Sequence, residues 1–290
     1  MTIVQKEKQL SVLLTGIYDE REASNIADRV MENITGWKKL DRIINKMKAL
    51  STEQESAMEK YEGQLLNHMP VQYVLHEAWF CGLKFYVDES TLIPRPETEE
   101  LVQWLVSEFS ALPKKTDYPV RILEVGTGSG CIPITLKKKL LSVELTSCDV
   151  SKAALHVAKK NSSTFETAIN YLHLDFLNRK EWARIPRVDC IISNPPYVCT
   201  IEKGTMSPNV LRYEPEQALF VADQDPLIFY RAIADFGKEK LENSGRIYVE
   251  INENLAREIA SLFSARGYSE IEIRMDMQGK QRMIKATWLP

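Results

Sequence analysis

The chain has 290 residues, 44% of them hydrophobic and 27% charged, and a formal net charge of −3. This composition is typical of a globular protein and argues against disorder, and the length favours one large domain with a smaller one over a single core. The slightly acidic total disfavours DNA or RNA as a partner, because nucleic-acid binding needs a basic surface.

The cysteines and histidines indicate no special site. The five cysteines form no CxxC pair, most lie in or beside apolar runs, and the four histidines show no metal-binding spacing. The first residues lack the apolar core of a signal peptide, and no stretch approaches the ~20 apolar residues that span a bilayer. We therefore expect a reduced, cytoplasmic monomer with no metal and no membrane partner.

The N-terminal quarter of the chain is predicted to be helical. Apolar residues recur at helical spacing in three successive segments, the third of which contains Leu40, Ile44 and Met47. A fourth helix is predicted to begin at a capping box formed by Thr52 and Glu55, in which each side chain satisfies the other residue's free backbone N–H. No catalytic constellation occurs here, so packing and docking are the expected roles.

The pattern then changes from helices to strands. The segment AWFCGLKFYV is aromatic and β-branched with a central glycine, which predicts a hairpin. After Pro119 strands alternate with helices, as in parallel βαβ units of a doubly wound sheet that binds ligands at the carboxyl ends of its strands. The last two strands are predicted to form an antiparallel edge. We predict a helical bundle over 1–76, a hairpin linker over 77–93 and an α/β, Rossmann-like domain over 94–290.

A glycine-rich loop, EVGTGSG, follows the first strand of this domain. Glycines let the backbone turn sharply and approach a ligand closely. The dinucleotide fingerprint GxGxxG would require glycine at the position of Cys131, so GxGxG favours an S-adenosylmethionine loop over NAD. Asp149 ends the second strand, where a carboxylate can accept both ribose hydroxyls. Asp175 and Phe176 end the third, suitably placed for an adenine amino group and ring.

The fourth strand, VDCIIS, is followed directly by Asn194, Pro195, Pro196 and Tyr197. If the Asn194 side-chain oxygen and the Pro195 carbonyl each accept one N–H of a planar amide or aromatic amine, they orient its nitrogen and favour the charge that it acquires during methylation. Pro196 stiffens the loop, and Tyr197 offers a ring face for stacking. This pattern predicts methyl transfer to a planar nitrogen.

These segments resemble the HemK/PrmC family of protein-(glutamine-N5) methyltransferases, which methylate the glutamine of the GGQ loop in peptide-chain release factors. The similar segments cover nearly the whole chain: PVQYVLHEAWFCGLKFYV, LIPRPETEELV, EVGTGSG, CDVS, LDF, SNPPYV, RYEPEQALF, IFYRAI and MQGKQR. The resemblance implies S-adenosylmethionine as cofactor, S-adenosylhomocysteine as its product, and a release factor as partner, docked by the helical bundle.

The resemblance also implies roles for particular residues. The residues expected to bind the cofactor are Arg95, Glu97, Glu124, Gly126, Thr127, Gly128, Ser129, Gly130, Asp149, Asp175, Phe176 and Asn194. Those expected to bind the substrate are Asn194, Pro195, Pro196, Tyr197 and Glu214, with Asn194, Pro195 and Tyr197 as the catalytic group. Glu214 follows a loop rich in Gly, Ser and Asn, which we expect to be flexible.

The chain departs from the family pattern at several positions. Glu124 stands where the family usually has Asp, His76 and Asn252 stand where it usually has Gly, and the segment ADQDPL lacks the usual glycines. These positions bear more on substrate fit than on the chemistry.

Three alternatives remain open at this point. A ribosomal-protein glutamine methyltransferase would share the catalytic loop. An adenine-N6 nucleic-acid methyltransferase would use a similar loop on a flipped base, although the acidic composition opposes it. A release-factor-binding or cofactor-sensing module would lack catalysis, which the intact NPPY and GxGxG segments oppose.

Overall fold

The computed structural model describes residues 1–111, 119–140 and 142–289. These residues fall into two compact units. The first comprises Met1–Glu77 with Ser207–Tyr213, and the second comprises Ala78–Met206 with Glu214–Pro290.

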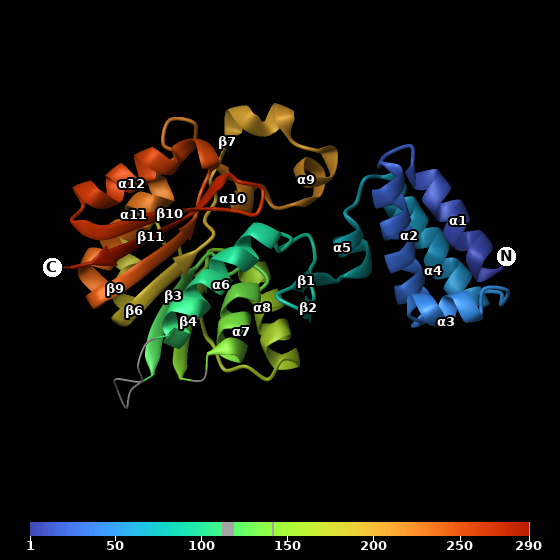
Figure 1. Cartoon of the computed structure of the whole chain (residues 1–290), viewed down its shortest axis with the longest axis horizontal. Helices are drawn as coiled ribbons and strands as arrows, with labels where there is room; N and C mark the ends of the chain where they lie inside the picture. The colour runs from blue at the N-terminus through green and yellow to red at the C-terminus, as the bar shows by residue number, and fades with distance from the viewer. Residues whose placement is uncertain (112–118, 141, 290) are drawn as a thin grey trace. The chain divides into compact units, whose positions relative to one another are not determined.

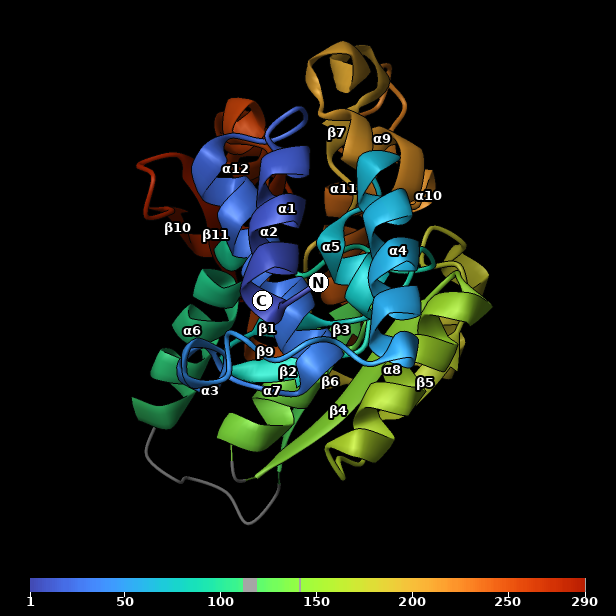
Figure 2. The ribbon, with the colours of Figure 1, turned by 90° about the vertical axis from the view of Figure 1, so that its right-hand side faces the viewer.

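The first unit is helical, as the sequence predicts (Figure 1). Its helices are α1 (Ile3–Leu14), α2 (Glu20–Thr35), α3 (Lys39–Ile44), α4 (Thr52–Leu66), α5 (Val71–Leu75) and α9 (Pro208–Tyr213). Helices α1, α2 and α4 pack around a core that includes Leu10, Leu14 and Met31, all fully buried. Figure 2 shows α1, α2 and α4 of this bundle in the view turned by 90°.

Two details of the bundle correct the sequence prediction. The capping box of α4 begins one residue earlier than expected: Ser51, not Thr52, accepts from the backbone N–H of Gln54, whose side chain accepts from the Ser51 N–H. Helix α3 leaves its apolar face uncovered, with Leu40 and Ile44 exposed by 74% and 79%.

Arg42 explains how α3 is held instead. Its guanidinium is buried, donates to the Trp37 carbonyl at 2.8 Å and pairs with Asp28. An apolar period shows which residues share a helix face, but it does not show that another element covers that face.

The second unit contains a seven-stranded sheet between two layers of helices, together with two small two-stranded sheets (Figure 1). Its helices are α6 (Pro96–Ala111), α7 (Cys131–Lys139), α8 (Lys152–Thr164), α10 (Glu216–Leu219), α11 (Ile228–Lys240) and α12 (Ala256–Ala265), with 3-10 helices η1 (Arg179–Arg184), η2 (Thr200–Thr205) and η3 (Glu253–Leu255). Its strands are β1 (Ala78–Phe80), β2 (Leu83–Phe85), β3 (Val120–Val125), β4 (Val143–Asp149), β5 (Asn170–His173), β6 (Val188–Ser193), β7 (Val198–Cys199), β8 (Phe220–Val221), β9 (Leu241–Glu250), β10 (Tyr268–Met275) and β11 (Gln281–Trp288).

The strand order of the large sheet is β10-β11-β9-β6-β3-β4-β5. Strands β5, β4, β3, β6 and β9 are parallel, and β11 runs antiparallel to both of its neighbours. One apolar core lies between the sheet and α11 and α12, and another lies between the sheet and α6 and α7. The predicted fold class and its antiparallel edge are confirmed, and the parallel strands bring the ends of β3, β4 and β6 to one edge.

The segment between β6 and α11 has more structure than the sequence predicts. The expected flexible loop before Glu214 contains η2 and α9, and α10 begins two residues after Glu214. Short helical turns of this kind carry too few apolar positions for a period to be visible.

None of the helices in the described residues combines the length and the apolar composition needed to cross a membrane.

Candidate active site

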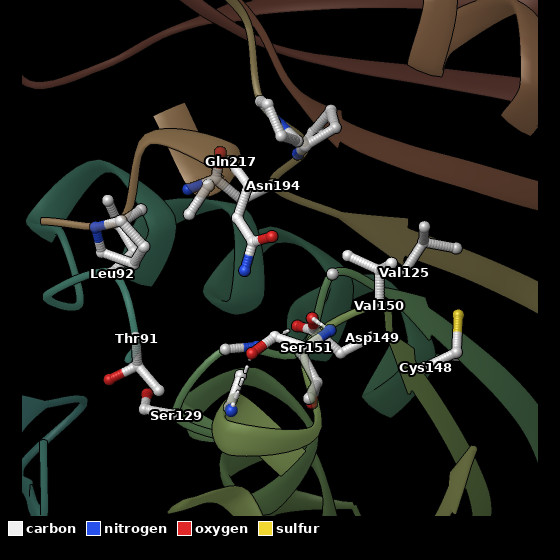
Figure 3. Close-up of a pocket in the computed structure, with 18 of the residues that line it drawn as sticks. Thr91, Leu92, Val125, Ser129, Cys148, Asp149, Val150, Ser151, Asn194 and Gln217 are labelled. Carbon is white, nitrogen blue, oxygen red and sulfur yellow. Dashed lines mark hydrogen bonds between the residues drawn. The ribbon is translucent and has the colours of Figure 1, made fainter. Parts of the chain in front are cut away.

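A cavity that opens to solvent lies at the carboxyl ends of β3, β4 and β6, with about 1030 Å³ of empty space when its open mouth is included. Its lining brings together the glycine loop, Asp149, Phe176 and the Asn194 loop, which are far apart in the sequence. Figure 3 shows the Asn194 amide projecting into the cavity on one side, with Asp149 and Ser151 on the other. The cavity therefore brings together most of the predicted cofactor and substrate residues, but its lining does not include Glu97, Glu124, Gly130, Tyr197 or Glu214.

The glycine loop needs its glycines for two physical reasons. Gly126, Gly128 and Gly130 have φ values of +82°, +52° and +79°, a region that residues with a Cβ rarely adopt. A Cβ on Gly130 would also lie 3.1 Å from the Cβ of Ala158. The third glycine thus lets α8 pack directly against the start of α7.

Asp149 is the carboxylate that closes this side of the cavity. Its Oδ2 accepts from the Gly128 N–H at 2.9 Å, and its Oδ1 accepts from the Ser151 N–H at 2.8 Å. Burial raises the pKa of Asp149, and the backbone N–H groups oppose that rise. Each oxygen keeps a further acceptor position, so the carboxylate fits a ligand diol.

Glu124 lies beneath the glycine loop, outside the cavity lining. Its Oε2 accepts from the Thr127 hydroxyl at 2.6 Å and from the Ser147 hydroxyl. The side chain is fully buried, and burial raises its pKa to about 7. Among the described residues nothing donates a hydrogen bond to Oε1. Glu124 supports the loop in this structure, and its expected cofactor contact stays a prediction.

The third strand end contributes an aromatic side chain to the cavity. Phe176 lines the cavity, and its ring packs 5.8 Å and 5.3 Å from the ring centres of Trp182 and Phe236. Asp175 also lines it and accepts from the Leu177 N–H at 3.0 Å. Both residues line the cavity, and their expected contacts with adenine stay a prediction.

The Asn194 side chain is held by a short series of hydrogen bonds. Its Nδ2 donates to Thr98 Oγ1 at 2.9 Å, and that hydroxyl donates to Glu250 Oε2 at 2.6 Å. The Tyr197 hydroxyl donates to Glu250 Oε1 at 3.0 Å. Because the amide nitrogen faces Thr98, the amide oxygen is left for another donor.

Thr98 and Glu250 were not singled out in the sequence. The segment LIPRPETEELV predicts a helix that begins near Thr98, and α6 begins two residues earlier, at Pro96. Glu250 is fully buried, and burial raises its pKa to about 7. An acidic residue between Val249 and Ile251 in the segment GRIYVEI is the one signal in the sequence for a buried carboxylate.

The residues that follow Asn194 differ in whether they line the cavity. Pro195 and Pro196 line the cavity, whereas the Tyr197 ring packs against the apolar core beneath α11 and is not part of the lining. Asn252, where the family usually has Gly, donates from Nδ2 to the Tyr197 carbonyl at 3.4 Å. Stacking of a substrate on Tyr197 stays a prediction.

Arg95 and Glu214 form a partly buried ion pair. Arg95 lines the cavity and donates to Glu214 Oε1 at 2.6 Å, and the Ile93 N–H donates to Glu214 Oε2 at 3.3 Å. The Glu214 side chain is only 1% exposed, so it anchors the Arg95 loop. Glu97 lies outside the lining and accepts from Gln278 at 3.5 Å. Roles of Glu97 and Glu214 toward ligands stay predictions.

Two further residues bear on the site and its margin. Asn161 donates from Nδ2 to the carbonyls of Ser129 and Tyr86, each at 2.9 Å, and so ties the glycine loop to the chain after β2. His76 ends α5 with φ +52°, which explains why a glycine suits that position. Within 1–111, 119–140 and 142–289, no cluster of three His, Cys, Asp or Glu side chains could hold a metal ion.

Comparisons with known proteins agree with both units. A family profile described as "PrmC N-terminal domain" matches residues 8–75, and one described as "Methyltransferase small domain" matches residues 103–213. A release factor glutamine methyltransferase of Flavobacterium psychrophilum is 38% identical and covers 99% of this chain and 100% of its own length. One of Bacteroides thetaiotaomicron is 36% identical, with 94% and 95% covered.

Solved structures show the same fold at low identity. The catalytic domain of hMettl16, crystallised in complex with a MAT2A 3′UTR hairpin, aligns with a TM-score of 0.53 at 13% identity, over 82% of this chain and 82% of that one. At this identity the match speaks for the architecture of the sheet and its helices alone.

Proposed function

We propose that this chain, which belongs to the family of release factor glutamine methyltransferases, methylates peptide-chain release factors. It transfers a methyl group from S-adenosylmethionine to the side-chain amide nitrogen of the glutamine in their GGQ motif. The observation that carries this proposal is the placement of Asn194, whose amide projects into a cavity walled by the glycine loop and Asp149. We further propose that the enzyme is cytoplasmic, because its substrate acts in translation.

The residues around the cavity fit the proposed cofactor. Asp149 retains acceptor positions for ribose hydroxyls, Phe176 offers a ring next to Asp175, and the glycine loop presents backbone without side chains. The unpartnered Oε1 of Glu124 could accept a donor reaching below the loop. When bound, S-adenosylmethionine supplies an electrophilic methyl group on a sulfonium.

The chain's own residues deal with the poor nucleophilicity of an amide nitrogen. Its lone pair is delocalised over the planar amide, so the nitrogen must be positioned and its developing charge stabilised. In the proposed mechanism Asn194 Oδ1 and the Pro195 carbonyl each accept one N–H of the substrate amide. Positioning of this kind can contribute roughly 7–11 kcal/mol. No base is needed beforehand, because the nitrogen's proton becomes acidic only once it is alkylated.

We propose a docking role for the first unit. Its helices form their own core and contribute no residue to the cavity lining. A methyltransferase for one glutamine of a large protein must recognise more than the glutamine, and this unit offers a separate surface for that recognition.

The proposal is tested by incubating the enzyme with labelled S-adenosylmethionine and four acceptors: a release factor, the same factor with GGQ changed to GGA, ribosomal proteins, and DNA. Label on the release factor, lost with GGA, is the expected result. Label on a ribosomal protein or on DNA would replace the proposed substrate, and binding of S-adenosylmethionine without any transfer would replace the enzymatic reading.

A further inference from the structure

The series Asn194–Thr98–Glu250 has an unusual property: each member can exist in two hydrogen-bonding states. The Thr98 hydroxyl has one proton and is bonded on both sides, to Glu250 Oε2 at 2.6 Å and to Asn194 Nδ2 at 2.9 Å. When it donates to Glu250, it must accept from the Asn194 NH₂ group. Its oxygen could accept from both Glu250 and the Asn194 NH₂ group, but the proton of this buried hydroxyl would then have no acceptor among its described contacts. When it accepts from Glu250, it therefore donates to Asn194, and only the amide oxygen can accept.

The two states leave opposite ends of the Asn194 amide for the substrate. With Glu250 ionised, the Asn194 oxygen is left to accept a substrate N–H. With a proton on Glu250 Oε2, the amide is reversed and presents its NH₂ group, which repels a substrate N–H. Tyr197 favours this position of the proton, because its hydroxyl already donates to Oε1 at 3.0 Å.

We propose that Thr98 and Glu250 are positioning residues that hold the Asn194 amide with its oxygen toward the substrate, and that protonation of Glu250 reverses this amide and switches methyl transfer off. The inference rests on the proposed function for its consequence on transfer, but the reversal itself does not require a substrate.

The surroundings of Glu250 place the pH at which it gains its proton near neutrality. The carboxyl is fully buried, and burial raises its pKa to about 7, against the hydrogen bonds from Thr98 and Tyr197 and the charge of Arg282 on β11. The charge of Glu97 on α6 raises it further. From α11, Tyr230 donates to the Glu250 backbone carbonyl at 3.0 Å and leaves the carboxyl to its other partners.

Substitutions separate the members of the series. Glu250→Gln can accept from Tyr197 through its oxygen and then presents NH₂ to Thr98, which locks Asn194 in the reversed state at every pH. Thr98→Val keeps the shape of the side chain but disconnects the two groups, so neither orientation is imposed. Thr98→Ser preserves the hydroxyl and is the matched control.

The first test follows the Asn194 side-chain amide by NMR in protein labelled with ¹⁵N-asparagine, without substrate, from pH 5.5 to 8.5. The resonance is assigned by its loss in Asn194→Asp. We expect it to shift with an apparent pKa near 7 in the wild type and in Thr98→Ser, and to stay constant in Glu250→Gln and Thr98→Val. A resonance that does not titrate in the wild type, or that titrates in Glu250→Gln, would overturn the proposal.

The second test measures single-turnover methyl transfer over the same pH range. Because only the ionised state is productive, the wild-type rate should fall about tenfold per pH unit below the pKa. At pH 8, Glu250→Gln should be slower than the wild type by roughly 10–100-fold, and Thr98→Val by severalfold. In both variants the fall in rate near pH 7 should be absent. A fall in rate that persists in Glu250→Gln would assign it to another group. If no acceptor is methylated at all, the proposed function fails while the NMR result still decides the switch.

Discussion

The cavity has two walls, one formed by the glycine loop with Asp149 and the other by the Asn194 loop. Both are supported in the same way, but the supporting residues come from different parts of the sequence. Each wall rests on one fully buried glutamate that accepts from two hydroxyl groups: Glu124 beneath the glycine loop and Glu250 behind Asn194. The partners of Glu124 lie on its own loop and on the adjacent strand β4, whereas those of Glu250 lie 152 and 53 residues away. The first wall is local in the sequence, and the second exists only in the folded unit.

In the proposed mechanism the glycine-loop wall binds the cofactor and the Asn194 wall orients the substrate, and the difference in support fits these two tasks. The glycine loop presents backbone and needs only a stiff support, which neighbouring residues supply. The proposed mechanism requires the Asn194 wall to fix which atom of a side-chain amide faces the substrate, and the polar groups that hold this amide converge from α6, β9 and the loop after β6. Four experiments bear on this comparison, in order of expected effect.

Alanine at one residue of each wall should separate rate from affinity. We expect Asn194→Ala to lower the rate of methyl transfer by roughly 100–1000-fold at saturating S-adenosylmethionine, because it removes an acceptor that stabilises developing charge. Asp149→Ala should instead weaken S-adenosylmethionine binding, measured by calorimetry, and retain much of the rate at saturation. Equal effects of the two substitutions on both quantities would abolish the distinction between the walls.

The two buried carboxyls should make the folded protein less stable as pH rises. An ordinary glutamate titrates at 4.5, whereas burial raises the pKa of both Glu124 and Glu250 to about 7. Below pH 4.5 both states are protonated; between 4.5 and 7 the unfolded chain releases a proton that the folded one retains. The free energy of unfolding therefore falls across this window, by up to roughly 3 kcal/mol for each group.

Urea unfolding at pH 5 and pH 8 isolates these contributions from other titrating groups. Glu124→Gln and Glu250→Gln should each gain stability relative to the wild type on going from pH 5 to pH 8. If the difference between wild type and variant is the same at both pH values, the carboxyl in question is not carrying the raised pKa.

A Cβ in the glycine loop should disturb the local wall without touching the other. Gly130→Ala forces a side chain into φ +79° and 3.1 Å from Ala158, at a cost of roughly 1–3 kcal/mol in unfolding free energy and with weaker S-adenosylmethionine binding. Gly63→Ala, in α4 with open space around it, is the matched control and should stabilise by about 0.5–1 kcal/mol. A neutral Gly130→Ala would show that the loop accommodates a side chain.

Removing one hydroxyl beneath each wall should give similar stability losses and different functional ones. Thr127→Val and Thr98→Val each take one donor from a buried carboxylate, at roughly 1–2 kcal/mol in the free energy of unfolding. Thr127→Val should raise the Kd for S-adenosylmethionine by a small factor, and Thr98→Val should lower the rate. A rate loss in Thr127→Val would show that the glycine loop also positions the reacting groups.

The main helices and strands of the sheet, and the residues that follow several of its strands, can be predicted from local patterns, but the bounds of α4 and α6 and the short helices before α11 cannot. Apolar runs, glycines and prolines predict the parallel strands, the glycine loop and the strand-terminal Asp149 and Asn194, because these features depend on neighbours in the chain. A local pattern cannot show whether another element packs against a helix face. The apolar spacing of Leu40 and Ile44 predicts a covered helix face that the structure leaves exposed.

Patterns along the chain are enough to predict the family, the α/β architecture and the residues at or just beyond the strand ends that line the cavity. Tertiary structure alone decided how those residues are supported. Thr98 and Glu250 carry no motif, and a buried carboxylate is recognised only when its distant hydroxyl partners are brought within hydrogen-bonding distance. The reason is physical: strand ends are set by backbone geometry along the chain, whereas the orientation of one side-chain amide is set by donors and acceptors that only folding brings together.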